Sequence, residues 1–270
     1  MNLLSRRVAL GLSLALVAFG ASPVGGATAQ NGSANVPIIA AAASLQFALE
    51  EIAEGFKSET GQSVRLSFGS SGNFARQIRQ GAPYEMFLSA DEDYVLDLAR
   101  SGLTRDEGAI YAVGRIVIYV PHGSLLKPDA SLDDLAAALD DGRIKRFAIA
   151  NPEHAPYGKR AEEALRHKQL WDRIRPKLVF GENISQAAQF ATSANAQGGI
   201  IAYSLAVSPH LSQLGTFALI PEQWHTPLRN RMVLLKTAGP VAERFYAYLQ
   251  EEQARRVFRK YGFVLPGEAS

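Results

Sequence analysis

FGSSGNFARQIRQG, residues 68–81, joins a strand pattern to a helix pattern through two serines that stand between two glycines. Apolar residues alternate up to Phe68, as in a strand, and Phe74 and Ile78 lie four residues apart, as on one face of a helix. Gly81 then ends the helical pattern. Because a strand passes into a helix within a few residues here, the stretch predicts one unit of an α/β fold.

The same alternation continues along most of the chain. The predicted strands are Val36–Ala42, Val64–Phe68, Met86–Leu88, Arg115–Val120, Phe147–Ala150, Leu178–Phe180 and Gly199–Tyr203. The predicted helices lie between Leu45 and Gly61, from Phe74 to Gly81, and over Asp91–Arg100, Leu132–Leu139, Gly158–Lys168, Ser185–Ala191 and the tail Pro240–Tyr261. This order predicts an α/β architecture with a largely parallel sheet, and its restart after Pro121 predicts a second lobe. No flexible linker divides the lobes, so we expect strands to cross between them.

Composition excludes several classes of function. The chain has 28 Lys+Arg against 26 Asp+Glu, whereas a nucleic-acid binder usually shows a basic excess. It has no cysteine, which excludes structural disulfides, thiolate catalysis and cysteine-based zinc sites. With 270 residues and 47% apolar content, it can bury a large core.

The N-terminus has the pattern of a secretory signal peptide. Arg6 and Arg7 precede the apolar run Val8–Phe19, and Ala27-Thr28-Ala29 supplies a small-residue cleavage site. We therefore expect a signal peptide over residues 1–29, cleaved near Ala29, and an exported protein. The sequence does not decide between the general and the twin-arginine export routes. Without Arg6 and Arg7 the mature chain carries 26 basic and 26 acidic residues, a formal net charge of zero.

Several corners share one order: a buried strand, then small or hydroxyl residues, then a helix. They are Ala42-Ala43-Ser44, Gly69-Ser70-Ser71-Gly72, Ala155-Pro156-Tyr157-Gly158, Glu182-Asn183-Ile184-Ser185 and Ala202-Tyr203-Ser204. A helix start leaves backbone N–H groups without intrahelical partners and carries about half a positive charge. A hydroxyl beside those groups adds a neutral donor. Such corners suit an anion, provided that they converge in space.

Each corner also has a simpler interpretation. Ser44 and Ser71 can be helix N-caps, each worth about 1 kcal/mol. Tyr157 can be part of a plain turn, and Tyr203 a buried residue at a strand end. A nucleophilic Ser71 finds little support, because the corner lacks the G-x-S-x-G pattern and the histidines are scattered. No H-x-x-x-H or H-E-x-x-H spacing indicates a metal site.

Taken together, the corners resemble those of the molybdate-binding periplasmic proteins, the substrate-binding components of molybdate ABC importers. The resemblance covers about residues 36–264. It is carried by Ala41-Ala42-Ala43-Ser44-Leu45, Phe68-Gly69-Ser70-Ser71-Gly72, Ala75-Arg76-Gln77-Ile78, Gly81-Ala82-Pro83, Ser89-Ala90-Asp91, Asn151–Gly158, Glu182-Asn183-Ile184 with Gln186-Ala187, and Lys260-Tyr261-Gly262-Phe263. The chain departs from the family pattern at Tyr84-Glu85-Met86 and at Ala150-Asn151-Pro152, which lie outside the expected donor positions.

The resemblance implies a two-lobed periplasmic binding protein of type II, with a mostly parallel sheet in each lobe and a ligand cleft between them. The implied lobes are residues 36–114 with 226–267, and residues 115–225. The implied oxyanion donors are Ser44 and Ser71 through hydroxyls and amides, Tyr157 and Ile184 through backbone N–H groups, and Tyr203 through its hydroxyl. Gly72 would allow close approach to the anion.

The implied function is high-affinity binding of molybdate and tungstate in the periplasm and delivery to the membrane subunits of an ABC permease. The resemblance implies no catalysis, no cofactor and no direct cation ligand, because molybdenum is bound as the oxyanion. We also expect a monomer that binds no nucleic acid. The alternatives are a sulfate or other oxyanion binder, a ferric-ion binder that uses Tyr157 and Tyr203, and an exported hydrolase that uses Ser71.

Overall fold

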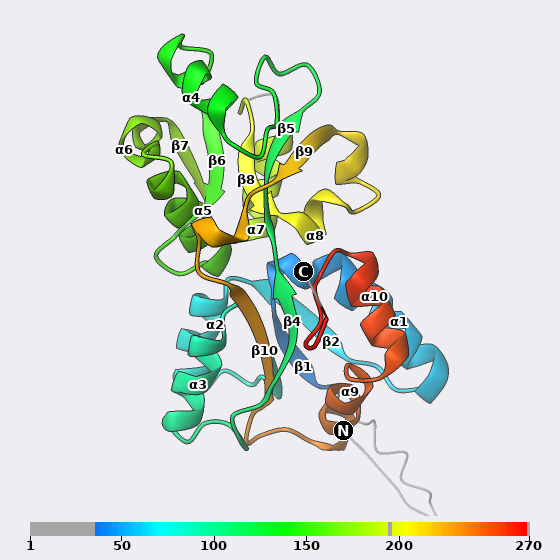
Figure 1. Cartoon of the computed structure of the whole chain (residues 1–270). Coiled ribbons are helices and arrows are strands. Elements are labelled where there is room, and N and C mark those ends of the chain that lie inside the picture. Colours follow the sequence, from blue (N-terminus) through cyan, green and yellow to red (C-terminus); the bar gives the residue numbers. More distant parts are fainter. Residues whose placement is uncertain (1–35, 194–195, 269–270) are drawn as a thin grey trace, which may run out of the picture. The chain divides into compact units, whose positions relative to one another are not determined.

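The computed structural model describes residues 36–193 and 196–268, which form two five-stranded sheets with helices around them (Figure 1). The predicted signal peptide lies outside the described residues. Within the described ranges, no helix combines the length and the apolar character that a membrane crossing requires.

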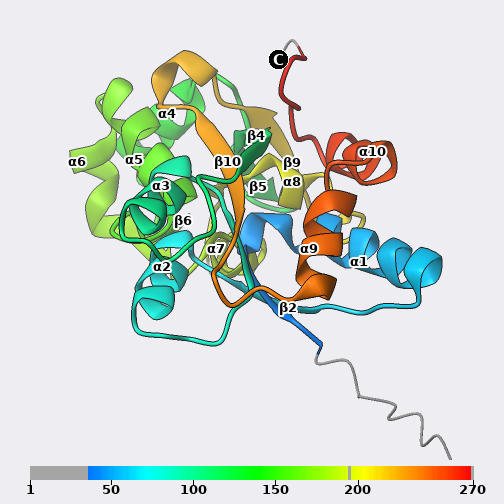
Figure 2. The ribbon, with the colours of Figure 1, turned by 90° about the horizontal axis from the view of Figure 1, so that it is seen from below.

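The first sheet has the order β2-β1-β3-β10-β4. Its strands are β1 Ile38–Ala42, β2 Arg65–Gly69, β3 Met86–Ser89, β4 Ala109–Gly114 and β10 Leu228–Leu234. Strand β1 pairs in parallel with β2 and β3, whereas β10 is antiparallel to β3 and β4. The helices of this part are α1 Gln46–Thr60, α2 Ser71–Arg79, α3 Glu92–Arg100, α9 Pro240–Tyr248 and α10 Glu252–Lys260. Helices α2 and α3 cover one side of the sheet, and α1, α9 and α10 cover the other (Figure 2).

The second sheet repeats this plan in the order β7-β6-β8-β5-β9. Its strands are β5 Ile116–Pro121, β6 Phe147–Ala150, β7 Leu178–Gly181, β8 Gly199–Ala202 and β9 Gly215–Leu219. Strand β6 is parallel to β7 and β8, and β5 is antiparallel to β8 and β9. The α-helices are α4 Asp133–Asp140, α5 Pro156–His167, α6 Trp171–Ile174, α7 Ile184–Thr192 and α8 Tyr203–Ala206. Short 3₁₀ turns are η1 Ala43–Leu45, η2 Arg175–Lys177, η3 Leu211–Gln213 and η4 Glu222–Trp224.

The chain passes between the two sheets twice. It first passes from β4 to β5 at Arg115, and it returns through residues 225–227, between η4 and β10. An ion pair between Arg115 and Glu222 (2.5 Å) links the first crossing to η4. In each sheet the strand next to a crossing, β10 or β5, runs opposite to its neighbours. We use lobe 1 for residues 36–114 with 226–267 and lobe 2 for residues 115–225, limits that stay a prediction.

Elements that the sequence analysis did not identify are those without a clear apolar period. Strand β10 carries polar Arg229, Asn230 and Arg231 in succession, yet Asn230 is fully buried and Arg231 pairs with Glu92 of α3 (2.9 Å). Strands β4 and β9 were also missed, as was the short helix α6. The positions of the three strands are set by pairing with distant strands, which a local pattern does not contain.

The predicted single helix Pro240–Tyr261 is wrong, because the tail forms two helices, α9 and α10. The break lets the two halves reach different partners. Phe245 of α9 packs edge-on against Phe56 of α1 (centroids 5.2 Å apart), whereas Phe258 of α10 packs on Tyr111 of β4 (5.3 Å). Tertiary packing therefore overrides a continuous amphipathic pattern here.

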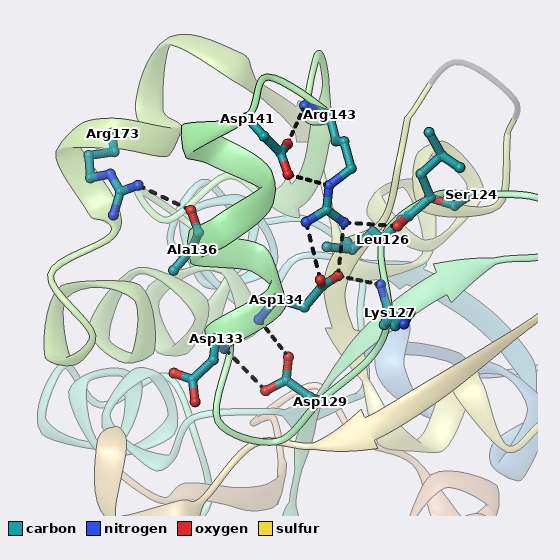
Figure 3. A network of polar contacts seen from close by, with 11 residues as sticks. Ser124, Leu126, Lys127, Asp129, Asp133, Asp134, Ala136, Asp141, Arg143 and Arg173 are labelled. Carbon is teal, nitrogen blue, oxygen red and sulfur yellow. Dashed lines mark hydrogen bonds and ion pairs between the residues drawn. The ribbon is translucent and has the colours of Figure 1, made fainter.

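A charged network fixes the start of α4 in lobe 2 (Figure 3). Leu132, the residue before the helix, is buried and has φ 59°, and its aliphatic side chain has no atom that could cap the helix. The carboxylate of Asp129 accepts hydrogen bonds from the N–H groups of Asp133 (3.1 Å) and Asp134 (3.0 Å) instead. Arg143 bridges Asp134 and Asp141, and it also donates to the Leu125 carbonyl (2.9 Å). Side-chain hydrogen bonds of this network therefore cap α4 and attach the neighbouring loops to its first turn.

We expect Phe245→Ala to lower the free energy of unfolding by about 3–5 kcal/mol, because it deletes a fully buried ring that packs on Phe56. Urea denaturation followed by circular dichroism measures the loss. Phe180→Ala is the matched control: its side chain is 45% exposed, so we expect a change of about 0.5 kcal/mol or less. Equal losses in the two variants would contradict this assignment of the core.

Candidate functional site

Strand ends and helix starts from both lobes enclose one small cavity of about 10 Å³. The described residues that line it are all neutral. They are Ala42, Ala43, Ser44, Gly69, Ser70, Ser71, Ala90, Ala155, Pro156, Tyr157 and Ile184. Four of the five predicted donor positions, Ser44, Ser71, Tyr157 and Ile184, therefore meet at one place. Four of the five corners thus converge, which is the condition for an anion site, and the donor roles themselves stay predictions.

Ser44 lies inside η1 and is not a helix cap. The N-cap position belongs to Ala42, and no side chain caps this turn. The Ser44 side chain is 2% exposed, and its Oγ has no hydrogen-bond partner among the described residues. An unpartnered buried hydroxyl is unfavourable by about 1–3 kcal/mol, which makes it a candidate for contact with a ligand.

Two hydroxyls of lobe 2 hold the backbone of η1 in place. Ser204 donates from its Oγ to the Ser44 carbonyl (2.7 Å), and Ser185 donates to the Ala43 carbonyl (3.0 Å). Because these serines stand on α8 and α7, the turn that presents Ser44 is fixed by the opposite lobe. Neither role has a local sequence signal, since the partners are more than a hundred residues apart.

Ser71 is the first residue of α2, and the N-cap is its neighbour Ser70. Ser70 Oγ accepts from the Asn73 N–H (3.4 Å), so the capping interpretation applies to Ser70 and not to Ser71. Ser71 is fully buried and its Oγ accepts from the Ala90 N–H (3.0 Å). This bond fixes the hydroxyl oxygen and leaves its proton free to donate.

Gly72 serves a contact between the lobes. Its N–H donates to the carbonyl of His154 (3.0 Å), and a Cβ added at Gly72 would lie 2.7 Å from that oxygen. The close approach of an anion to Gly72 stays a prediction, and the structure shows that Gly72 admits the backbone of lobe 2.

His154 contacts the same corner through its ring. Its Nδ1 lies 3.0 Å from Ser70 Oγ, and its Nε2 lies 3.6 Å from Glu182. The serine in contact with a histidine is thus Ser70, which is occupied as a helix cap, whereas Ser71 bonds to Ala90. A hydrolase that uses Ser71 therefore gains no support.

Tyr157 stands in the first turn of α5, and its side chain is 2% exposed. No hydrogen bond of good geometry reaches its hydroxyl from a described residue, although the hydroxyls of Ser44 and Ser204 lie close enough to lower its pKa. Burial has the larger effect and raises the pKa of the phenol well above its usual value. The following Gly158 is needed because a Cβ there would lie 2.1 Å from the Ala150 carbonyl. A Cβ at Gly114 would likewise lie 2.2 Å from the Tyr157 hydroxyl. The raised pKa therefore keeps the Tyr157 phenol neutral and protonated.

Ile184 begins α7, behind an Asn183 cap that accepts from the Gln186 N–H (3.1 Å). Like Ser71 and Tyr157, it carries a backbone N–H in the first helical turn, where no intrahelical carbonyl is available. Among the described residues, none of these three N–H groups has a hydrogen-bond partner. Three helix starts therefore bring unused donors to the cavity.

Tyr203 is the exception among the five predicted residues. It begins α8 but does not line the cavity, and its N–H already donates to the Arg115 carbonyl (2.9 Å). Its ring packs on Phe217 (centroids 5.6 Å apart) and stands where a Cβ on Gly262 would lie, at 2.4 Å. The structure does not bring its hydroxyl to the other four residues.

Two α/β lobes joined by two crossings, with a donor-lined cavity between their helix starts, define a two-lobed solute-binding protein. The chain belongs to the family described as bacterial extracellular solute-binding proteins, whose model matches residues 38–264. It is accordingly a binding protein and not an enzyme.

Relatives that are named for the ligand they bind confirm the resemblance to molybdate-binding periplasmic proteins. The chain is 35% identical to the molybdate-binding protein ModA of Rhodobacter capsulatus over 230 residues, which cover 84% of this chain and 87% of that one. It is 34% identical to ModA of Escherichia coli over 233 residues, 83% and 87% of the two chains. Among solved structures, the periplasmic molybdate-binding protein of Azotobacter vinelandii superposes with a TM-score of 0.76 at 28% identity, covering 85% and 99%.

We expect Tyr157→Phe to leave the ligand-free protein as stable as the parent or more stable by about 1 kcal/mol, because it removes a buried hydroxyl without a partner. Ser71→Ala should instead be destabilising by about 1–3 kcal/mol, because the buried Ala90 N–H loses its acceptor. Guanidinium denaturation without oxyanion compares the two. A larger loss for Tyr157→Phe than for Ser71→Ala would show that the phenol has a structural partner.

Proposed function

We propose that this protein binds molybdate, and tungstate with it, in the periplasm and delivers the anion to the membrane subunits of an ABC importer. The observation that carries the proposal is the set of unused donors around one neutral cavity: the buried Ser44 hydroxyl and the first-turn N–H groups of Ser71, Tyr157 and Ile184. The relatives named as molybdate-binding proteins support this choice of anion.

The donor set suits a dianion without a counter-charge. A dry cavity requires that each anion oxygen be hydrogen-bonded, since desolvation otherwise costs too much. Hydrogen bonds to a charged group contribute about 1.5–3 kcal/mol each, and helix starts add favourable dipoles. None of the described lining residues is a carboxylate, so no strong anionic acceptor is present for the proton of an anion such as hydrogen phosphate, which disfavours that ligand.

We propose the site with Ser44, Ser71, Tyr157 and Ile184 as donors. Tyr203 was the expected fifth donor, but it is not among the residues that line the cavity. The Tyr157 hydroxyl is a better candidate for that place, because it is buried, neutral and without a partner.

The rival ligands have weaker support. A sulfate-binding protein of Mycobacterium tuberculosis superposes with a TM-score of 0.70, but at 15% identity this likeness concerns the fold alone. A ferric site would need phenolate ligands, and burial raises the pKa of Tyr157, which opposes the phenolate. Among the described residues, no group of three His, Asp or Glu side chains could hold a metal ion.

The first experiment is a thermal-shift screen of the mature protein against molybdate, tungstate, sulfate, phosphate and ferric citrate. A ligand that binds only the folded state raises the free energy of unfolding by about 4 kcal/mol when its concentration is a thousandfold above its Kd. We expect a large shift with molybdate and tungstate and little with sulfate. A shift with sulfate alone would show that the ligand is sulfate and not molybdate. The absence of a shift with every oxyanion would refute the proposed site.

Ser71→Ala should weaken molybdate binding by about 1–3 kcal/mol, because one anion oxygen loses a donor inside a buried cavity. Isothermal titration calorimetry measures the change in Kd. Ser212→Ala, at an exposed serine outside the cavity, is the control and should bind like the parent. An unchanged Kd in the Ser71 variant would remove this residue from the site.

A further inference from the structure

A buried charged cluster beside the cavity joins the two lobes. Arg160 of α5 donates from Nη2 to Asp91, which precedes α3 in lobe 1 (2.7 Å), and from Nη1 to Glu163 on its own helix (2.8 Å). The side chain of Arg160 is 5% exposed, and that of Asp91 is 13% exposed. The guanidinium thus spans carboxylates of both lobes, of which Asp91 is largely buried and Glu163 is 28% exposed.

The cluster adjoins both the donors and a crossing. Asp91 directly follows Ala90, whose N–H fixes the Ser71 hydroxyl, and Arg160 lies one helical turn after Tyr157. The second oxygen of Glu163 accepts from the Thr226 N–H (2.7 Å), in the segment that returns the chain to lobe 1. The guanidinium therefore links the Ser71 corner, the start of α5 and one crossing.

We propose that the Asp91–Arg160 ion pair holds the two lobes closed around the anion, so that it sets the affinity without touching the ligand. This inference rests on the proposed function. The two partners belong to different lobes, so movement of the lobes apart breaks the pair and returns both charges to water. Closure buries them again, and it is favourable only while each charge finds its partner.

The pair should act on every anion alike. When the binding-competent closed state is only partly populated, the apparent Kd rises by the same factor for any ligand of that state. A residue that contacts the anion instead changes the Kd values of two anions by different factors, since they differ in size. The ratio of two Kd values therefore separates a closure residue from a donor.

Asp91→Asn tests the proposal because loss of the ion pair and loss of the negative charge near the anion change the Kd in opposite directions. Asp91 carries a negative charge next to a residue that lines the cavity, so its removal would by Coulomb's law alone tighten the binding of a dianion. Loss of the ion pair would weaken binding, because Arg160 stays buried without its lobe 1 partner. Asparagine also preserves the helix start, where Asp91 Oδ1 accepts from the Asp93 N–H (3.1 Å).

The experiment compares the parent, Asp91→Asn and the control Glu162→Gln. Glu162 pairs with Arg166 on the same helix (2.7 Å), within lobe 2. Calorimetry gives the Kd of molybdate and of tungstate for each protein, and denaturation without ligand gives its stability. We expect Asp91→Asn to raise both Kd values at least tenfold and by one common factor, with ligand-free stability like that of the control. Arg160→Lys, which cannot reach both carboxylates, should weaken binding in the same direction and replaces Asp91→Asn if that variant does not fold.

Three results would overturn the proposal. Unchanged or tighter binding by Asp91→Asn shows that closure does not depend on the pair, and a changed ratio of the two Kd values places Asp91 among the ligand contacts. A loss of ligand-free stability with unchanged Kd values assigns the pair to folding alone. The parent is titrated first. If it binds neither anion, the proposed function fails and this inference fails with it. Normal binding by both the parent and the variant refutes only the role of the Asp91–Arg160 ion pair in closure.

Discussion

The site depends on one constraint: the first backbone N–H groups of a helix have no carbonyl partner within that helix. In this protein α2, α5 and α7 begin at the ends of β2, β6 and β7, and all three starts reach the same cavity. Parallel strands end at the same edge of a sheet, which brings the starts of α5 and α7 together, whereas α2 follows a strand of the other sheet and meets them where the two lobes face each other. The cavity follows from how strands are ordered in two sheets rather than from any reactive side chain.

The serines around this cavity have two different hydrogen-bonding roles. Ser70 caps α2, and Ser185 and Ser204 bond the backbone of η1 from the opposite lobe. These bonds position Ser44 and Ser71, whose hydroxyls are the proposed donors to the ligand. A hydroxyl can donate and accept at once, so serine can both hold the backbone around the cavity and supply a hydroxyl to the cavity.

Charge is kept out of the cavity but is placed close to it. The described lining residues are neutral, while Arg160 is balanced by Asp91 and Glu163 one layer away. This arrangement offers an anion only hydrogen bonds and dipoles, whose geometry favours a particular size. It also adds an ionic contact between the lobes, beside the neutral hydrogen bonds that Gly72, Ser185 and Ser204 make, and water solvates these ionic groups when the lobes separate.

The sequence by itself determined the alternation of strands and helices, the presence of a second lobe and the candidate donors at helix starts, because these follow from local period and local capping chemistry. It also indicated the family, through the order of its corners. Only the tertiary structure decided that Ser70 and not Ser71 caps α2, that Gly72 admits His154, and that Tyr203 packs on Phe217. It likewise split the tail helix and placed β4, β9 and β10, because each of these depends on partners far away in the chain, which no local pattern specifies.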